Sequence, residues 1–341
     1  MRGSGASHPT DVDVPSDKPQ AELQVGGQAV IEGVVMRTAD RWALAVRRPG
    51  GDMFVTVNPI LTIAQKHPRW NKFPLRGIFA LADSLIIGVK ALSISGGVAL
   101  EETAQEGDGE AVEQREEDRP DSETSPHEKE TKSIGGLPIA ISMLFALVLF
   151  LGLFIVFPAW IAKQFDSSVH NVVVYNLIEG GIRIAIFVLY LAAMDLMPDV
   201  RRVFQYHGAE HKVVHAYESG EPLTPEAASK FSTAHMRCGT AFLLIVFVLS
   251  ILVFSLLGRP ALWLRVLERL AIIPFVAAFS YEIIKFAGRH EDSRVMKVVM
   301  SPGLLLQKLT TRQPDESQLE VAIVSLEAAL DASATAAAAD G

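Results

Sequence analysis

Long apolar stretches, separated by polar ones, dominate the pattern along this chain of 341 residues. Four of them stand out: 137–162, 178–198, 240–257 and about 270–286. The first and the third contain no charged residue, and the fourth is interrupted by Pro274 and Glu282. A helix that rises about 1.5 Å per residue needs roughly twenty apolar residues to cross the hydrocarbon core of a bilayer. The pattern therefore predicts a mainly α, multispanning membrane protein with about four transmembrane helices, which form a membrane domain over 133–290.

Shorter apolar runs before the first long stretch predict a small β subdomain over 24–75. The runs lie at 28–36, 42–46 and 53–57. The sequence Pro-Gly-Gly-Asp at 49–52 is a strong turn signal, so the last two runs predict a hairpin. Residues 1–23 are polar and lack the apolar core of a signal peptide, so we expect a disordered N-terminal lead.

Two segments separate this subdomain from the membrane domain. Residues 76–100 are moderately apolar but carry Asp83 and Lys90, which predicts an interfacial or re-entrant helix, with a full membrane span as the alternative. Residues 101–132 hold thirteen Asp or Glu against four Lys or Arg and contain no apolar run. This composition predicts an acidic disordered linker.

The C-terminal part contains one amphipathic stretch. Its apolar residues recur on one helical face, at Leu319, Ile323, Leu326 and Leu330. We expect a C-terminal segment over 291–331 whose helix docks on the β subdomain or on a protein partner. A disordered tail over 332–341 should follow.

Basic residues indicate how the spans are oriented, because loops on the cytoplasmic side carry more Lys and Arg. Five Lys or Arg lie in 199–239, whereas 163–177 holds only Lys163. Four spans then place the loop 199–239, the β subdomain and both termini in the cytoplasm, with the protein in the cell membrane. Arg259 and Arg265 in the short outer loop oppose this orientation. The net charge of −8 gives no support for a nucleic-acid partner.

The segment after the second apolar stretch carries the candidate chemistry. It contains the motif H-x-x-E-H at His207, Glu210 and His211. Side chains at positions i and i+4 of a helix lie one turn apart on the same face, so both imidazoles can bind one divalent metal ion such as zinc. Glu210 can then accept a proton from water, as in the zinc proteases with this inverted motif. The structural alternative is a helix on the membrane surface whose polar side pairs with Arg and lipid headgroups.

A third metal ligand has to come from another segment, because His215 lies roughly 12 Å along the helix from His207. We rank His235 first, Glu282 second and Cys238 third as this ligand. The structural alternatives are a capped helix start with a buried thiol for His235 and Cys238, and an ion pair with Lys285 or Arg183 for Glu282. Cys238 is also the single cysteine, which excludes an internal disulfide.

Several strings of this sequence are similar to a known family. They lie at 26–34 (GGQAVIEGV), 204–212 (FQYHGAEHK), 237–240 (RCGT), 302–304 (PGL) and 306–312 (LQKLTTR). On these strings the chain resembles the YqhQ-like bacterial membrane proteins, the family of unknown function 1385, over about residues 24–330. The resemblance implies a multispanning membrane protein of a family labelled as predicted metal-dependent enzymes, and it supplies no substrate.

Two functions from different classes fit these features. The first is a metal-dependent hydrolase at the cytoplasmic membrane surface, in which His207 and His211 bind the metal and Glu210 activates water. The second is a non-catalytic membrane scaffold or assembly factor, in which the histidines are structural or bind metal without an open coordination position. A transporter ranks below both, because the sequence shows no inverted repeat. The lipid bilayer is the expected environment in each case.

Overall fold

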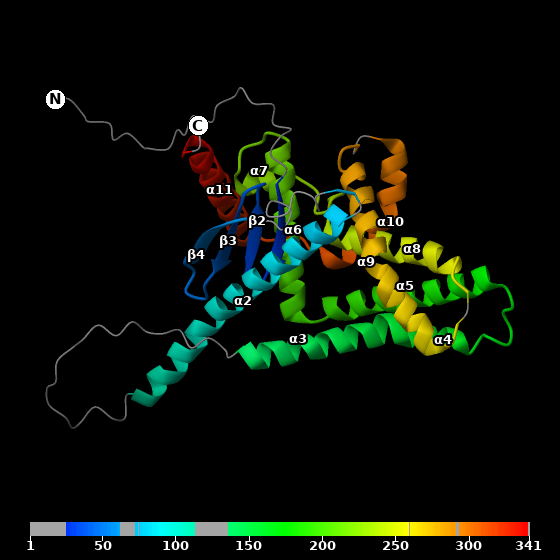
Figure 1. Cartoon of the computed structure of the whole chain (residues 1–341). Helices are drawn as coiled ribbons and strands as arrows, with labels where there is room; N and C mark the ends of the chain where they lie inside the picture. Colours follow the sequence, from blue (N-terminus) through cyan, green and yellow to red (C-terminus); the bar gives the residue numbers. More distant parts are fainter. Residues whose placement is uncertain are drawn as a thin grey trace, which may run out of the picture.

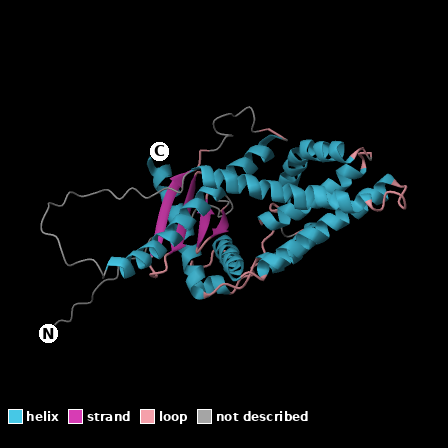
Figure 2. Cartoon of the chain, turned by 90° about the horizontal axis from the view of Figure 1, so that it is seen from below, coloured by secondary structure: helices cyan, strands magenta, loops and turns pink. Residues whose placement is uncertain are grey.

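The computed structural model describes residues 25–61, 72–73, 75–112, 136–258, 260–290 and 293–339. It joins a small sheet to a long helical body (Figures 1 and 2). Among the described residues, four helical segments are long and apolar enough to cross a membrane: Leu75–Ala99, Leu144–Lys163, Val172–Asp195 and Leu262–Ala287. The predicted fold class, mainly α with about four such spans and a small N-terminal β subdomain, is confirmed. The expected lead 1–23 and residues 113–132 of the expected linker lie outside the described residues.

The N-terminal sheet is antiparallel, with the strand order β1-β2-β3-β4. Its strands are β1 (Gly26–Val30), β2 (Gly33–Arg37), β3 (Arg41–Arg47) and β4 (Met53–Pro59). The apolar run at 28–36 forms two strands, because the chain reverses within it and Val30 pairs with Gly33. Glu32 makes this turn with a φ of 52°, a left-handed conformation that few residues other than glycine adopt. The predicted hairpin between the last two strands is confirmed.

One face of the sheet is covered by α2 (Leu75–Val112). Ile87 and Ala91 of this helix pack in one apolar cluster with Trp42 and Leu44 of the sheet. The helix begins where the interfacial helix was predicted and continues into the first residues of the expected linker. Its apolar part is long enough for a span, but one side of it is used against the sheet.

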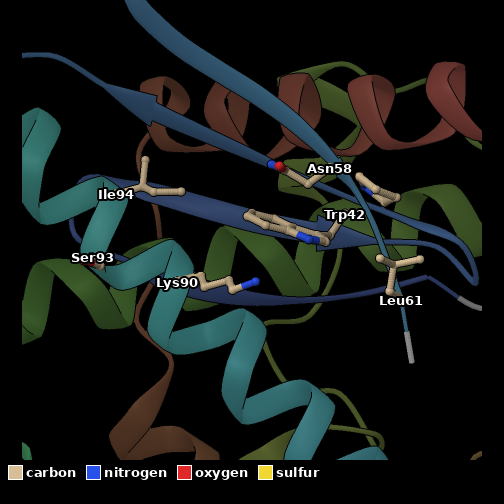
Figure 3. Close-up of a pocket in the computed structure, with 7 residues that line it drawn as sticks. Trp42, Asn58, Leu61, Lys90, Ser93 and Ile94 are labelled. Atoms are coloured by element: carbon tan, nitrogen blue, oxygen red, sulfur yellow. The ribbon is translucent and has the colours of Figure 1, made fainter. Parts of the chain in front are cut away.

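A shallow groove lies at the edge of this contact (Figure 3). Trp42 and Asn58 of the sheet and Lys90 of α2 are among its lining residues. None of the seven residues that line it is a His, Cys, Asp or Glu. The groove therefore offers none of the chemistry that the sequence analysis singled out.

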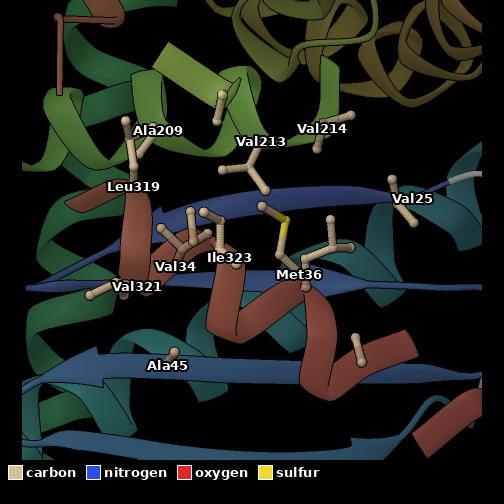
Figure 4. Packing of buried hydrophobic residues seen from close by; sticks show 14 of the residues in the cluster. Val25, Val34, Met36, Ala45, Ala209, Val213, Val214, Leu319, Val321 and Ile323 are labelled. Atoms are coloured by element: carbon tan, nitrogen blue, oxygen red, sulfur yellow. The ribbon is translucent and has the colours of Figure 1, made fainter. Parts of the chain in front are cut away.

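The opposite face of the sheet is covered by α6 (Pro198–Glu218) and α11 (Glu316–Ala339). Figure 4 shows Val213 of α6 and Ile323 of α11 directed toward Met36 of the sheet. These residues belong to one buried apolar cluster. The predicted C-terminal helix thus uses its apolar face inside the chain, against the β subdomain.

The apolar helices that follow α2 form the long body. They are α3 (Gly136–Leu151), the π-helical turn η2 (Gly152–Val156), α4 (Phe157–Lys163), α5 (Val172–Asp195), α8 (Gly239–Ser255) and α9 (Leu262–Ala287). Both α5 and α9 begin several residues before the predicted spans. Arg269 precedes the predicted fourth span, and it pairs inside the body with Glu179 of α5, so this charge does not interrupt α9. In α8 the apolar helix is only 17 residues long.

Three polar segments of the sequence are helical in the structure. The stretch 199–239 is largely helical, in α6 and in the short α7 (Pro225–Ser229). A further helix, α10 (Arg294–Thr310), precedes α11 and packs on α8. The expected disordered tail is helical as far as Ala339, because its alanine-rich sequence has high helix propensity.

Candidate metal centre

Helix α6 carries the H-x-x-E-H motif into the interior of the protein. Pro198 lies in its first turn, where a missing backbone N–H costs nothing. The rings of His207 and His211 lie one turn apart, with centroids separated by 4.5 Å. Glu210 and His211 are buried. The motif therefore lies in packed protein rather than on an exposed helix face.

Backbone carbonyl groups orient both imidazole rings. His207 Nδ1 lies 2.8 Å from the carbonyl oxygen of Thr310, and His211 Nδ1 lies 2.5 Å from that of Thr233. A carbonyl oxygen can only accept a hydrogen bond, so each Nδ1 carries a proton. This leaves each Nε2 available as a ligand, and the same arrangement holds most metal-binding histidines.

Cys238 is the residue that meets these two rings. Its Sγ lies 3.3 Å from His207 Nε2. The ligand atoms of His207, His211 and Cys238 all lie within 4.8 Å of one another. Cys238 is also the N-cap of α8, and its sulfur accepts a hydrogen bond from the backbone N–H of Thr240 at 3.4 Å. The candidate ranked third from the sequence thus has its ligand atom in this group, while the ring of His235, ranked first, lies with its centroid 5.6 Å from that of His211.

Glu210 lies beside the same three groups. Its Oε2 is 3.6 Å from His211 Nε2 and 4.0 Å from His207 Nε2. Strand β1 forms a wall behind this carboxylate, and a Cβ atom at Gly27 would lie 2.7 Å from Glu210 Cγ. Glycine at this position therefore allows the strand to approach the site.

The charges of the group favour an ion pair between sulfur and imidazole. Burial opposes protonation of His207, but Cys238 and Glu210 outweigh it and raise the pKa of His207 to about 9. Burial also opposes ionisation of Cys238, yet His207 and His211 hold the pKa of this thiol well below its usual range. A thiolate is the form of cysteine that binds a metal, so the surroundings prepare Cys238 as a ligand.

His235, ranked first from the sequence, lies in a second group with His215 and Glu218. Its Nε2 is 3.5 Å from Glu218 Oε2, and its Nδ1 accepts a hydrogen bond from the backbone N–H of Arg237 at 3.2 Å. The proton of the neutral ring is therefore on Nε2, which donates toward the carboxylate. His215 donates to the carbonyl oxygen of Ala234 at 3.0 Å, and burial lowers the pKa of His215 to about 4.

Glu282, ranked second, is not brought to the motif. It lies on α9 and forms a two-pronged ion pair with Arg76 of α2, with Oε1 2.5 Å from Nε. A carboxylate on an apolar helix is costly without a partner. The structural alternative for this residue was an ion pair with Lys285 or Arg183, whereas its partner is Arg76, more than two hundred positions away in the sequence.

Comparison with known proteins supports the family resemblance that the sequence strings indicate. A family model described as a protein of unknown function (DUF1385) matches residues 73–332. The chain belongs to this family.

The chain is also similar to the uncharacterized protein YqhQ of Bacillus subtilis (strain 168). It is 34% identical over 309 residues, which cover 88% of this chain and 90% of the relative. No solved structure matches the chain.

In this DUF1385 chain, Gly208 is a supporting residue that the sequence pattern did not identify. A side chain at Gly208 would collide with the carbonyl oxygen of Arg312. The absence of a Cβ atom therefore lets the segment after α10 lie against α6. This contact brings the carbonyl oxygen of Thr310 within reach of His207.

Two buried polar side chains hold the loop that leads from α7 to α8. The side-chain amide of Gln307 binds the backbone of His235 twice, with Oε1 and Nε2 each at 2.8 Å. Lys212 Nζ donates to the carbonyl oxygens of Ser229 and Phe231, at 2.7 and 2.6 Å. Their roles become recognisable only in three dimensions, because neither residue belongs to the H-x-x-E-H motif.

Proposed function

We propose that this protein is a membrane-bound, metal-dependent enzyme of the hydrolase type. The observation that carries the proposal is the convergence of His207 and His211 with Cys238, whose ligand atoms lie within 4.8 Å of one another. Two imidazoles and a thiolate from separate segments are typical of a zinc site. Three protein ligands leave the fourth position of a tetrahedral ion for water or substrate, as catalytic zinc sites do.

The residues of the site fit a metal in two further respects. Both Nδ1 atoms are engaged with backbone carbonyl groups, so both Nε2 atoms face the sulfur of Cys238. The low pKa of Cys238 favours its thiolate. His207, His211 and Cys238 would hold the ion, and His235 would remain outside the ligand set.

Glu210 is the proton carrier in this proposal. Zinc held by His207, His211 and Cys238 would supply Lewis acidity toward a carbonyl or phosphoryl substrate. Glu210 Oε2 accepts the proton of the attacking water and returns it to the leaving group. The backbone carbonyl groups of Thr233 and Thr310 keep both rings oriented throughout. A substrate at the membrane surface, such as a peptide or a lipid headgroup, suits this location.

We place the site and both termini on the cytoplasmic side of the cell membrane. Residues of the sheet, α6 and α11 share one buried cluster, which includes Met36, Val213 and Leu326. Parts of one packed unit lie on one side of a membrane, so an even number of crossings must separate them. The α3–α4 segment and α5 provide two crossings before α6, and α8 and α9 provide two before α11.

The same argument supports an interfacial position for α2. A crossing by α2 would make the number between the sheet and α6 odd, which the shared cluster does not allow. Ile87 and Ala91 already pack on the sheet. Leu85, Val89 and Leu92 are exposed on α2, and an apolar stripe of this kind suits the boundary between headgroups and acyl chains.

Metal analysis of the detergent-purified, full-length protein tests the proposal. We expect about one zinc per chain in the wild type and in Glu210→Gln, and little in His211→Ala or Cys238→Ser. His290→Ala removes an exposed histidine that follows the end of α9 and is the matched control. In the cobalt-substituted protein, Cys238→Ser should abolish the thiolate charge-transfer absorption. A wild type without metal, or a His211→Ala variant that keeps it, contradicts the proposal.

The second candidate is a non-catalytic scaffold with a structural metal. It is favoured by the position of Glu210, whose Oε2 lies within 4.0 Å of both Nε2 atoms and can serve as a fourth ligand. Azide added to the cobalt-substituted protein distinguishes the two. An open position binds azide and changes the visible spectrum, whereas a closed site leaves it unchanged. A closed site also loses metal affinity in Glu210→Gln.

A further inference from the structure

A second buried polar cluster lies in the membrane domain, and no part of the proposed function uses it. It consists of Glu179 and Arg183 on α5 with Arg265 and Arg269 on α9, and we refer to it as the arginine cluster. All four side chains are 8% exposed or less. Ionised residues within membrane helices are rare and usually mark a functional site.

The charges of the arginine cluster do not balance. In the part of the chain that the structure describes, Glu179 is the one carboxylate that pairs with the three guanidinium groups. Three positive charges and one negative charge leave a net charge of +2 in a buried position. Arginine does not lose its proton in proteins, so the cluster cannot relieve this excess by deprotonation.

Two of the guanidinium groups are already well bound. Arg269 donates to both oxygens of Glu179, and Arg183 donates to Oε1 of the same carboxylate at 3.0 Å. Arg183 Nε also donates to the carbonyl oxygen of Phe154, at 2.9 Å. Phe154 lies in the π-helical turn η2, a type of irregularity that is frequent at functional sites.

Arg265 is held less firmly. Its nearest carboxylate oxygen, on Glu179, is 3.9 Å away. Its hydrogen bonds go to the hydroxyl group of Tyr175 at 2.8 Å and to the carbonyl oxygen of Pro260 at 3.3 Å. A guanidinium group has five N–H donors in a planar fork. Arg265 therefore keeps donor capacity and most of the uncompensated charge.

The position of Arg265 suits a ligand at the membrane boundary. The residue lies one turn after the start of α9 at Leu262, about 5 Å along the helix axis. This is the end of the membrane domain opposite to α6, since α6 follows the other end of α5. An anion of the headgroup region can approach Arg265 there by replacing its long contact with Pro260.

We propose that the arginine cluster binds a phosphate group, carried by an anionic lipid headgroup or by free phosphate. A phosphate offers several acceptor oxygens to the guanidinium fork, which binds such groups in two-pronged fashion. Its negative charge offsets the excess of the cluster. The site is independent of the metal centre, and it requires no catalytic activity.

Ligand-induced stabilisation of the full-length protein in detergent tests this proposal. The probes are inorganic phosphate and dihexanoyl phosphatidic acid, with dihexanoyl glycerol as the uncharged control. We expect a phosphate probe to raise the thermal unfolding midpoint of the wild type. Arg265→Gln should weaken its apparent affinity about tenfold or more, the size of one charge-assisted contact. Arg201→Gln, which removes an exposed arginine near the other end of α5, should have no effect.

The outcomes separate the possible sources. A response to phosphatidic acid alone assigns the site to lipid, and a response to inorganic phosphate assigns it to the free ion. Arg265→Lys keeps the charge without the planar fork, so it should weaken binding less than Arg265→Gln, and it serves if the Gln variant does not fold. The proposal is overturned if neither phosphate probe acts on the wild type. Equal responses in wild type and both Arg265 variants, or an equal response to the uncharged glyceride, also overturn it.

Discussion

The two buried polar clusters of this protein are built from opposite kinds of groups. Around His207, the ring nitrogens, the thiol and the carboxylate can gain or lose protons, and backbone carbonyl groups satisfy their remaining donors. In the arginine cluster the charges are permanent, and one carboxylate serves three guanidinium groups. The first kind of site can adapt its charge to an incoming cation, because its ligands release protons. The second kind cannot adapt, and so it favours an anion.

Removal of the carboxylate from the arginine cluster should have the largest effect on stability. Glu179→Gln keeps the side-chain volume but leaves three buried guanidinium groups without a carboxylate. The loss of one partner from a buried ion pair costs about 3–5 kcal/mol. We expect a clear fall in the thermal unfolding midpoint. Inorganic phosphate should raise the midpoint of this variant by more than it raises that of the wild type.

The matched control for this variant is Glu282→Gln. Glu282 also pairs with an arginine, Arg76, but that guanidinium side chain is 37% exposed. An ion pair of this kind contributes about 0–1 kcal/mol. Equal losses in both variants would contradict the distinction between a buried and a partly exposed ion pair.

A methyl group at Gly208 should disturb the metal centre without altering a ligand. Gly208→Ala pushes α6 away from the backbone at Arg312, which we expect to cost about 1–3 kcal/mol. The shift also moves the carbonyl oxygen of Thr310 away from His207. Loss of such an outer partner typically lowers metal affinity by about 10–100-fold.

Competition with a zinc chelator measures this change in affinity. Gly181→Ala is the control, because a Cβ atom at Gly181 meets nothing within 4 Å. It replaces one helical glycine with alanine and should leave zinc binding unchanged. If Gly208→Ala binds zinc as the wild type does, the backbone contact with His207 does not support the metal centre.

Acid should produce the smallest effect, through His215. Its pKa of about 4 in the folded protein lies below the usual value of about 6.5. Between these two values the unfolded chain binds the proton and the folded chain does not, so stability falls as the pH falls through this window. The slope is at most about 1.4 kcal/mol per pH unit, and partial exposure of the ring reduces it.

Thermal unfolding at pH 7 and at pH 5 measures this effect. The variant His215→Gln cannot bind the proton, so it should lose less stability than the wild type over the same interval. An equal loss in both proteins would show that other groups control the acid response.

The fold was largely predictable because its strongest signals are local. Uncharged apolar runs identify α3–α4 and α8, and the spacing of Leu319, Ile323 and Leu326 identifies the face of α11 that packs on the sheet. The early start of α9 was hidden, because Arg265 and Arg269 lie before its apolar run, and only the fold shows that Arg269 pairs with Glu179 of α5. The β1–β2 turn was hidden as well, since it depends on the left-handed backbone of Glu32.

Only half of the candidate site could be read from the sequence. The spacing of His207 and His211 indicates two rings on one helical face, and the structure has this arrangement. The order of His235, Glu282 and Cys238 as the third partner depended on chemistry alone. Which of them meets the motif is decided by how α8 begins beside α6. The carbonyl groups of Thr233 and Thr310 carry no side-chain signal at all.

The close approach of Gly27 to Glu210 implies that the N-terminal sheet is needed for the candidate site. The family match begins at residue 73, after the whole sheet, yet β1 forms the wall behind the carboxylate. A chain trimmed to the matched region would keep every candidate ligand. It would lose β1, however, and bulk water would then reach Glu210. It would also leave the apolar sides of α6 and α11 without their partner, so the region that the family model matches is narrower than the candidate site.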